Sequence, residues 1–507
     1  MSDRTLARDL RRAAVEVFNE HPLAGLAAAL VSDGKLRWSA GLGVADAKAG
    51  RPVDASTVFR IGSISKTMTA LAVMQLVEEG RVSVDEPVQA HLRSVRLEQR
   101  DGSGGPVTIR HLLTHTGGLG ELRRWSDLLR PTIGLAAKPG EVPALARYYA
   151  PALRAEVAAG SKWAYANHGF ALLGQLVEDV TGEPFARRLR TRVFEPLGMN
   201  GTDFQRSERV RDRLAVGYAF KRGALRPVKD REIVVEPAGS VFSSLENMAL
   251  YAAAVAGGGA NRHGRVVAAE TLEAMLAPQW PPDGLPAMGL AFMLDRLGPH
   301  LVAGHDGGWP GFISSLVVVP DAGVAALAFT NTTVASAPHD LTERVLRRAL
   351  GIGDEDGREP VPERPHLWPE LVGVYRPPPG PNTNFRLWPL TAGEVQVAVS
   401  KGRLVATALS PLKELRRGIP LHAADQDDPL VFVARVGKAE VPVVFERGSA
   451  GEIEAVRAGS ARGGFVRLVR RPRATSIRLW ARAGAGAAAA VGVTTLARRL
   501  SRRAEED

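Results

Sequence analysis

Residues 59–67 read FRIGSISKT, and this stretch decides how the first domain folds. A strand-like lead-in and a glycine precede Ser63, where we expect a helix to begin. Ser63 and Lys66 are three residues apart, so a helix places them on one face. A serine hydroxyl is a poor nucleophile near neutral pH, and a partly desolvated lysine can serve as its base. The helix N-terminus also favours negative charge that develops beside Ser63.

The Ser-x-x-Lys pattern alone is weak, because the chain contains two further copies at residues 32–35 and 410–413. The first lies in a predicted hairpin turn and the second in a predicted β region, so neither opens a helix. Taken alone, Ser63 and Lys66 are more typical of a helix-capping serine and an exposed lysine than of a catalytic pair. The catalytic hypothesis therefore depends on further motifs.

A second motif consists of Tyr165 and Asn167, the only Tyr-x-Asn in the chain, in a predicted loop before a helix over residues 170–180. A phenolate beside Lys66 could take the Ser63 proton and return it to a leaving group, while the amide orients a substrate carbonyl. Alone, the pair is more typical of an aromatic core residue and a turn asparagine.

A third motif, HDGG, contributes His305, Gly307 and Gly308 just before a predicted strand over residues 312–320. Glycines there let a substrate backbone lie along a sheet edge, and the Gly308 N–H could complete an oxyanion hole with that of Ser63. Taken alone, the motif is more typical of a plain glycine-rich turn.

The first 353 residues have strand patterns at both ends and helical patterns between them. An amphipathic helix is expected at the start and a closing helix at the end. Two hairpins with Asp-Gly and Asp-Ala-Gly turns flank the helical middle. We therefore predict an α/β (α+β) domain over residues 1–353, with one antiparallel sheet built from both ends and an inserted helical region. The expected elements are helices 6–20, 68–79, 172–180, 185–194, 245–256 and 341–350, and strands 24–31, 36–44, 316–320 and 324–330.

The remaining chain divides by composition into three parts. Residues 354–369 have the Gly, Pro and charge content of a linker. Residues 370–468 carry short alternating segments at 395–399, 404–409, 430–433, 441–445 and 465–468, which predict a small antiparallel β-barrel or sandwich. Residues 469–507 form a basic, Ala- and Gly-rich tail. Its longest uncharged run has 15 residues, short of the roughly 20 that cross a bilayer, which favours a flexible or helical tail over a membrane anchor.

Charge and composition limit the partners. Of the formal net charge of +11, the residues from Arg467 onward contribute +7, with ten arginines against three acids. The other residues carry only +4 and no nucleic-acid-binding signature, so no nucleic-acid partner is expected. The chain has no cysteine, no zinc-hydrolase motif and no phosphate-binding loop, so we expect no metal and no cofactor. Acidic residues interrupt any Sec-type signal, which makes the cytoplasm the expected location.

In this order and approximate spacing the three motifs resemble those of the serine β-lactamase and penicillin-binding-protein-like superfamily, especially its class C-like esterases and peptidases. Residues 108–119, 195–199 and 237–240 support the resemblance, which covers residues of about 10 to 350. It implies an antiparallel sheet flanked by helices, with Ser63 as nucleophile at the head of a buried helix. It also implies Lys66 as the base or its activator and Tyr165 as the acid and base.

By the same resemblance Asn167, His305, Gly307 and Gly308 bind substrate. His305 stands where relatives carry a lysine that meets the substrate carboxylate, and this departure favours esterase or D-peptidase chemistry over penicillin hydrolysis. We therefore expect a serine hydrolase that forms an acyl-enzyme on Ser63 and acts on small esters or D-amino peptide-like amides. The alternatives are a β-lactamase or DD-carboxypeptidase, and a non-catalytic protein that binds peptidoglycan fragments or acts as a scaffold.

Other hydrolase classes fit less well. No Gly-x-Ser-x-Gly occurs, which disfavours an α/β-hydrolase. His115 and His168 are the histidines nearest the motifs, and for both we expect structural hydrogen-bonding roles rather than catalysis. The oligomeric state leaves no signature in the sequence.

Overall fold

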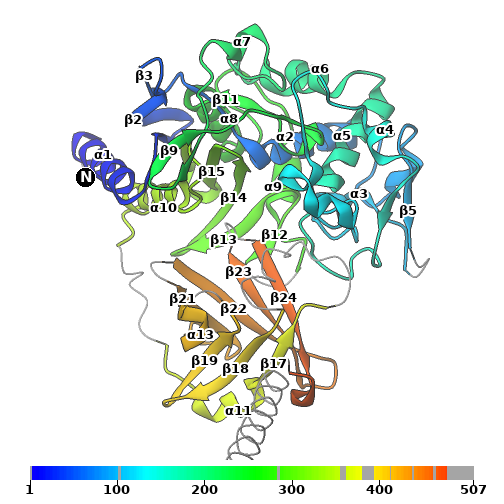
Figure 1. Cartoon of the computed structure of the whole chain (residues 1–507), viewed down its shortest axis with the longest axis vertical. Coiled ribbons are helices and arrows are strands. Elements are labelled where there is room, and N and C mark those ends of the chain that lie inside the picture. The colour runs from blue at the N-terminus through cyan, green and yellow to red at the C-terminus, as the bar shows by residue number, and fades with distance from the viewer. Residues whose placement is uncertain are drawn as a thin grey trace, which may run out of the picture. The chain divides into compact units, whose positions relative to one another are not determined.

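The computed structural model contains two compact units, residues 1–358 with 460–464 and residues 359–459 with 465–507 (Figure 1). The structure describes residues 3–100, 104–281, 286–353, 361–378, 393–410, 413–436, 439–460 and 464–476. Residues 354–360 of the predicted linker and residues 477–507 of the predicted tail lie outside the described residues.

The first unit is built on an eight-stranded antiparallel sheet in the order β12-β13-β14-β15-β16-β1-β2-β3. Strand β1 pairs with β16 along its length, so the two ends of the unit meet in the middle of the sheet, as the hairpin patterns predict. The strands are β1 (Gly25–Ser32), β2 (Lys35–Asp46), β3 (Arg51–Pro52), β12 (Ala287–Met288), β13 (Met293–Leu297), β14 (His300–Trp309), β15 (Phe312–Val319) and β16 (Val324–Thr330).

Both faces of this sheet are covered by helices. Helices α1 (Asp3–Glu20) and α10 (Ser336–Leu350) pack on one face, and α8 (Leu245–Ala256) packs on the other (Figure 1). Successive side chains of a strand point to opposite faces, so β1 contributes to both cores and is apolar from Leu26 to Val31. Its residues Ala27, Ala29 and Val31 enter one core, and Leu26, Ala28 and Leu30 enter the other.

The inserted region surrounds one central helix, α2 (Ser65–Glu78), whose first twelve residues are all buried. Its middle, from Ala70 to Met74, is apolar on every side, which is typical of a buried helix. Two predicted positions need correction. A 3₁₀ turn, Gly62–Ile64, carries Ser63, and α2 begins only at Ser65. Asn167 is not in a loop but begins helix α5 (Asn167–Thr181), whose polar first turn lacks the apolar spacing that marks a helix.

Smaller elements complete this unit. Its other helices are α3 (Ile109–Leu113), α4 (Leu145–Tyr149), α6 (Phe185–Leu189), α7 (Glu208–Arg211) and α9 (Ala269–Leu276). Four small two-stranded pairs are β4 (Val58–Arg60) with β11 (Phe242–Ser244), β5 (Leu97–Gln99) with β7 (Leu153–Ala155), β6 (Ala136–Ala137) with β10 (Glu232–Ile233), and β8 (Tyr218–Lys221) with β9 (Ala224–Pro227).

The second unit is a closed antiparallel barrel in which β17 pairs with both β18 and β24. The barrel form of the prediction is thus confirmed. Its strands are β17 (Gly373–Arg376), β18 (Val395–Ser400), β19 (Arg403–Ala408), β20 (Ile419–Ala423), β21 (Val431–Val436), β22 (Ala439–Arg447), β23 (Ile453–Ser460) and β24 (Gly464–Arg471). The sequence did not mark β17, β20 and β23, because they are short or their apolar alternation is broken by proline or charge.

A short helix, α11 (Trp368–Leu371), precedes the barrel, and α13 (Lys413–Arg417) follows β19. In the described part of the chain, no helix has both the length and the apolar character needed to cross a membrane.

Candidate active site

Ser63 lies in a tight turn between strand β4 and helix α2. Gly62 adopts a φ of +52°, in the left-handed region that glycine tolerates best. A Cβ atom at Gly62 would lie 2.7 Å from the Gly308 backbone nitrogen of strand β14. The turn that carries Ser63 therefore packs backbone to backbone against the third motif.

The Lys66 amine has three polar neighbours. Its Nζ lies 3.0 Å from Ser63 Oγ, 2.7 Å from Asn167 Oδ1 and 2.7 Å from the main-chain oxygen of Ala238. A neutral amine has two N–H groups and one lone pair. Because the amide and carbonyl oxygens only accept, they take both N–H groups, and the lone pair then faces the Ser63 hydroxyl. This arrangement suits proton removal from Ser63.

Burial favours the neutral amine. The Lys66 side chain is fully buried, and this desolvation holds its pKa well below the ordinary value, although the charge of Glu121 opposes the shift. Nζ also lies 4.8 Å from the ring centroid of Tyr165 and 5.6 Å from that of Phe170. These aromatic faces stabilise an ammonium once a proton arrives. Lys66 can therefore take up and release a proton.

Tyr165 lies just before α5, and its ring meets two histidines. The ring centroids of Tyr165 and His115 are 4.3 Å apart, and those of Tyr165 and His305 are 6.2 Å apart. The two residues of the second motif thus both contact the Lys66 amine, in different ways. Asn167 binds the amine of Lys66 by a hydrogen bond, while Tyr165 presents its ring to it.

The third motif forms the end of strand β14. The ladder with β13 ends where Met293 pairs with Gly304, whereas residues 305–309 continue to pair with β15. Among the described strands, this stretch therefore has a ladder partner on one side only. A substrate backbone can add to such an open strand edge.

Glycine is required at position 307 because strand β14 passes very close to the segment just before Ser63. A Cβ atom there would lie 1.9 Å from the Ile61 carbonyl oxygen and 2.3 Å from Ser314 Oγ. The Ser314 hydroxyl donates to the same Ile61 oxygen at 2.8 Å. Strand β15 is thus joined to the chain just before Ser63, and Gly307 leaves the space for that bond.

His305 offers a hydrogen-bond acceptor rather than a positive charge. Its Nδ1–H donates to the Asp306 carbonyl oxygen at 2.6 Å, because a carbonyl can only accept. Its Nε2 is buried and has no hydrogen-bond partner among the described residues. Burial, followed by the nearby charge of Lys66, lowers the pKa of His305 to about 4. The imidazole is therefore neutral around pH 7.

All seven sequence-predicted site residues lie in this region. Hydrogen bonds join Ser63, Lys66 and Asn167, and ring contacts add Tyr165 and His305. Gly307 and Gly308 lie against the Ser63 turn. Sequence reasoning missed the main-chain oxygen of Ala238, since a carbonyl has no residue-type signature. The surrounding PAGS motif, residues 237–240, was the only available signal.

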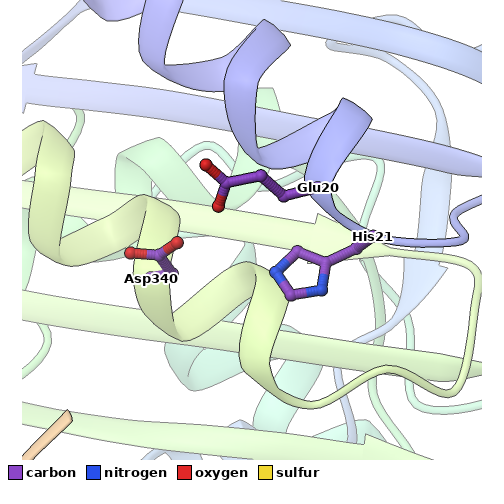
Figure 2. Close-up of side chains that lie close together, drawn as sticks. All are labelled: Glu20, His21 and Asp340. Atoms are coloured by element: carbon purple, nitrogen blue, oxygen red, sulfur yellow. The ribbon is translucent and has the colours of Figure 1, made fainter. Parts of the chain in front are cut away.

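A separate cluster of possible metal ligands lies at the layer of α1 and α10. Among the described residues, Glu20, His21 and Asp340 bring three potential ligand atoms within 4.8 Å of one another (Figure 2). The Arg344 guanidinium pairs with Glu20 at 2.9 Å and with Asp340 at 2.6 Å. Arg344 thus already occupies oxygens of both carboxylates, and we interpret the cluster as an ion-pair network.

Comparison with known proteins identifies the family. Residues 10–350 match the beta-lactamase family. The chain belongs to that family. The match contains the eight-stranded sheet, the inserted helices and every candidate site residue described above.

Several proteins are similar to this beta-lactamase family member. Esterase EstB of Burkholderia gladioli is 35% identical over 230 residues, which cover 44% of this chain and 56% of the esterase. Penicillin-binding protein 4 of Amycolatopsis lactamdurans is 28% identical over 390 residues, which cover 70% and 94% of the two chains. The octameric penicillin-binding protein homologue from Pyrococcus abyssi has the same fold, with a TM-score of 0.58 at 23% identity over 91% of this chain and 99% of that chain.

Proposed function

We propose that the chain is a serine hydrolase that forms an acyl-enzyme on Ser63 and acts on small uncharged esters or on short amides resembling D-amino peptides. The observation that carries the proposal is the 3.0 Å contact between Ser63 Oγ and Lys66 Nζ, with both N–H groups of a neutral lysine already bound to oxygens. The family supports hydrolysis by a serine, and the 35% identity to an esterase supports an ester substrate.

In the first step Ser63 Oγ attacks the acyl carbon while its proton passes to Lys66. The oxyanion that forms would accept hydrogen bonds from the N–H groups of Ser63 and Gly308. The Gly308 nitrogen lies against Gly62, the residue before Ser63. Collapse breaks the bond to the leaving oxygen or nitrogen, which takes the proton from Lys66 through Tyr165. Water then attacks the acyl-Ser63 ester and gives its proton to the same pair, which releases the acid and restores the hydroxyl.

The third motif supports an uncharged substrate. A substrate carboxylate beside His305 would find a neutral imidazole with a buried acceptor nitrogen, and an acceptor repels a carboxylate. Desolvating a carboxylate without a cation costs several kcal/mol. This argument favours esters and amides without a charged group at that position, and it disfavours the β-lactam and DD-carboxypeptidase alternatives.

The test is intact-mass spectrometry of wild type and Ser63→Ala after treatment with a fluorophosphonate probe. Turnover of p-nitrophenyl butyrate and of nitrocefin is measured in parallel. We expect one adduct on the wild type, none on Ser63→Ala, and faster turnover of the ester than of the lactam.

Two other outcomes would contradict parts of the proposal. An adduct together with faster nitrocefin turnover would overturn the substrate class but keep the nucleophile. No adduct and no turnover of either substrate would favour a non-catalytic protein that binds peptidoglycan fragments.

A further inference from the structure

The starting observation is that one histidine binds the main chain on both sides of Tyr165. The His115 main-chain oxygen accepts from the Ala164 N–H at 2.8 Å, and its Nδ1 accepts from the Ala166 N–H at 3.1 Å. His115 itself has a φ of +59°, which is rare for a residue with a side chain and marks a position held by its surroundings.

The same imidazole also packs against the tyrosine ring. The His115 ring centroid lies 4.3 Å from that of Tyr165 and 5.1 Å from that of Phe170. Both of these rings face the Lys66 amine. His115 is 2% exposed and therefore contacts both the ring of Tyr165 and the main chain on either side of it from a buried position.

The hydrogen bonds require a neutral His115. Nδ1 accepts from a backbone N–H, so the single ring proton is on Nε2, which is buried without a partner among the described residues. In a doubly protonated ring, the Nδ1–H would face the Ala166 N–H, and neither group could accept a hydrogen bond from the other. Burial, then the charge of Lys66, then His305, hold the pKa of His115 well below its usual range, in agreement with this tautomer.

We propose that His115 is a positioning residue that holds the Tyr165 phenol beside Lys66 by binding the N–H groups of the residues on either side of that tyrosine. This inference rests on the proposed function, because it concerns the proton path of the same site. It predicts that His115 acts on the chemical step through Tyr165 alone. A displacement of about 1 Å in a catalytic group can lower the rate about 100-fold.

The experiment is a double-mutant cycle between His115 and Tyr165, with p-nitrophenyl butyrate as substrate. His115→Phe keeps a ring but removes the Nδ1 acceptor. We expect it to lower kcat about 100-fold while KM changes by less than about threefold. In a Tyr165→Phe background the same substitution should change kcat by less than about threefold, because the group that it positions is already gone.

Rescue separates hydrogen bonding from packing. The Oδ1 atom of His115→Asn occupies the place of Nδ1, and asparagine tolerates a positive φ. This variant should recover to within about tenfold of wild-type kcat. If His115→Phe does not fold, His115→Gln replaces it in the cycle, because its amide oxygen is one bond too far out to meet the Ala166 N–H.

His168 provides the matched control. It is equally buried, at 1% exposure, and its Nδ1 lies 2.9 Å from the Tyr149 hydroxyl rather than near Tyr165. His168→Phe should lower the unfolding temperature but leave kcat within about threefold when measured below that temperature.

The inference would be overturned by equal kcat losses in His115→Phe and His168→Phe. It would also be overturned if His115→Phe lost the same factor with and without the Tyr165 hydroxyl. These failures differ from failure of the proposed function, in which the wild type itself shows no turnover that depends on Ser63.

Discussion

Lys66 shows how single side chains set the chemistry of this site. Its amine is enclosed by two oxygens that can only accept and one hydroxyl that can donate. Burial favours loss of the lysine proton, and a neutral His305 adds no second cation nearby. Under the proposed function, the neutral Lys66 amine would act as the base beside Ser63 and become an ammonium only when the proton is transferred.

Replacing His305 with lysine should change substrate preference. An ammonium at the third motif would attract a substrate carboxylate, which the neutral imidazole does not. We expect His305→Lys to raise the ratio of nitrocefin to p-nitrophenyl butyrate turnover, as kcat/KM, by about tenfold or more, a difference of about 1.4 kcal/mol. His305→Gln is the uncharged control. Equal ratios in the two variants would show that charge at this position does not select the substrate.

Glu236 should make the stability of the fold depend on pH. It begins the turn that supplies the Ala238 oxygen to Lys66. Burial, with smaller contributions from Glu232 and Glu178, raises its pKa from 4.5 to about 7. The folded state thus binds this proton more tightly than the unfolded state. The stabilisation is complete below about pH 4.5 and is lost as the pH rises through about 7.

Glu236→Gln keeps the shape of the protonated side chain and removes this titration. Relative to wild type, it should gain about 1–3 kcal/mol of unfolding free energy between pH 4.5 and pH 8. Urea denaturation at both pH values measures the difference. A difference between the two proteins that is the same at both pH values would contradict the prediction.

At the scale of elements, the site depends on the contact between strand β14 and the turn that carries Ser63. The β14 backbone meets that turn at Gly307 and Gly308, where even one carbon atom at Gly307 would collide with the Ile61 carbonyl. Backbone atoms cannot move aside as flexible side chains do. The strand therefore limits where the turn that carries Ser63 can lie.

Gly307→Ala should therefore be damaging. Its Cβ would lie 1.9 Å from the Ile61 oxygen, so either the strand or the Ser63 turn must shift. Overpacking of this kind typically costs about 1–3 kcal/mol, and we expect turnover to fall about 100-fold or more. Gly308→Ala is the control for stability, because its Cβ would meet only Ile313 at 3.6 Å, an ordinary contact. A Gly307→Ala protein as stable as Gly308→Ala would contradict the close approach.

At the scale of the whole molecule, the chain contains two units with separate cores. The largest core cluster of the first unit includes α2 and one face of the sheet, and every candidate site residue lies in this unit. The barrel has its own core, in which Phe445 packs edge-on against Tyr375 and Phe432. Units with separate cores can unfold in separate transitions.

Phe445→Ala should weaken only the barrel. Phe445 is 2% exposed, and removing a buried phenylalanine side chain costs about 3–5 kcal/mol. We expect calorimetry to show one transition shifted to lower temperature and the other unchanged. Ser63-dependent turnover below both transitions should stay at the wild-type level. A shift of both transitions would show that the two units unfold together.

The sequence by itself determined the local patterns and the order of the motifs. Hairpin turns, apolar periodicity and three short motifs predicted the α/β domain, the barrel and the seven candidate residues. The sequence-based prediction missed elements that have no clear local pattern. The polar first turn of α5 hid its start at Asn167, and short or interrupted alternation hid three barrel strands.

Only the tertiary structure decided the electrostatic state of the site. Two of the groups around the Lys66 amine, the Asn167 amide and the main-chain oxygen of Ala238, are 101 and 172 residues away from Lys66 along the chain. The neutral state of His305 depends on its burial and on its hydrogen bond to the Asp306 carbonyl. The contacts of His115 with the segment around Tyr165 likewise exist only in the folded chain. A sequence records which groups are present, whereas desolvation and hydrogen-bond geometry exist only once distant segments have packed together.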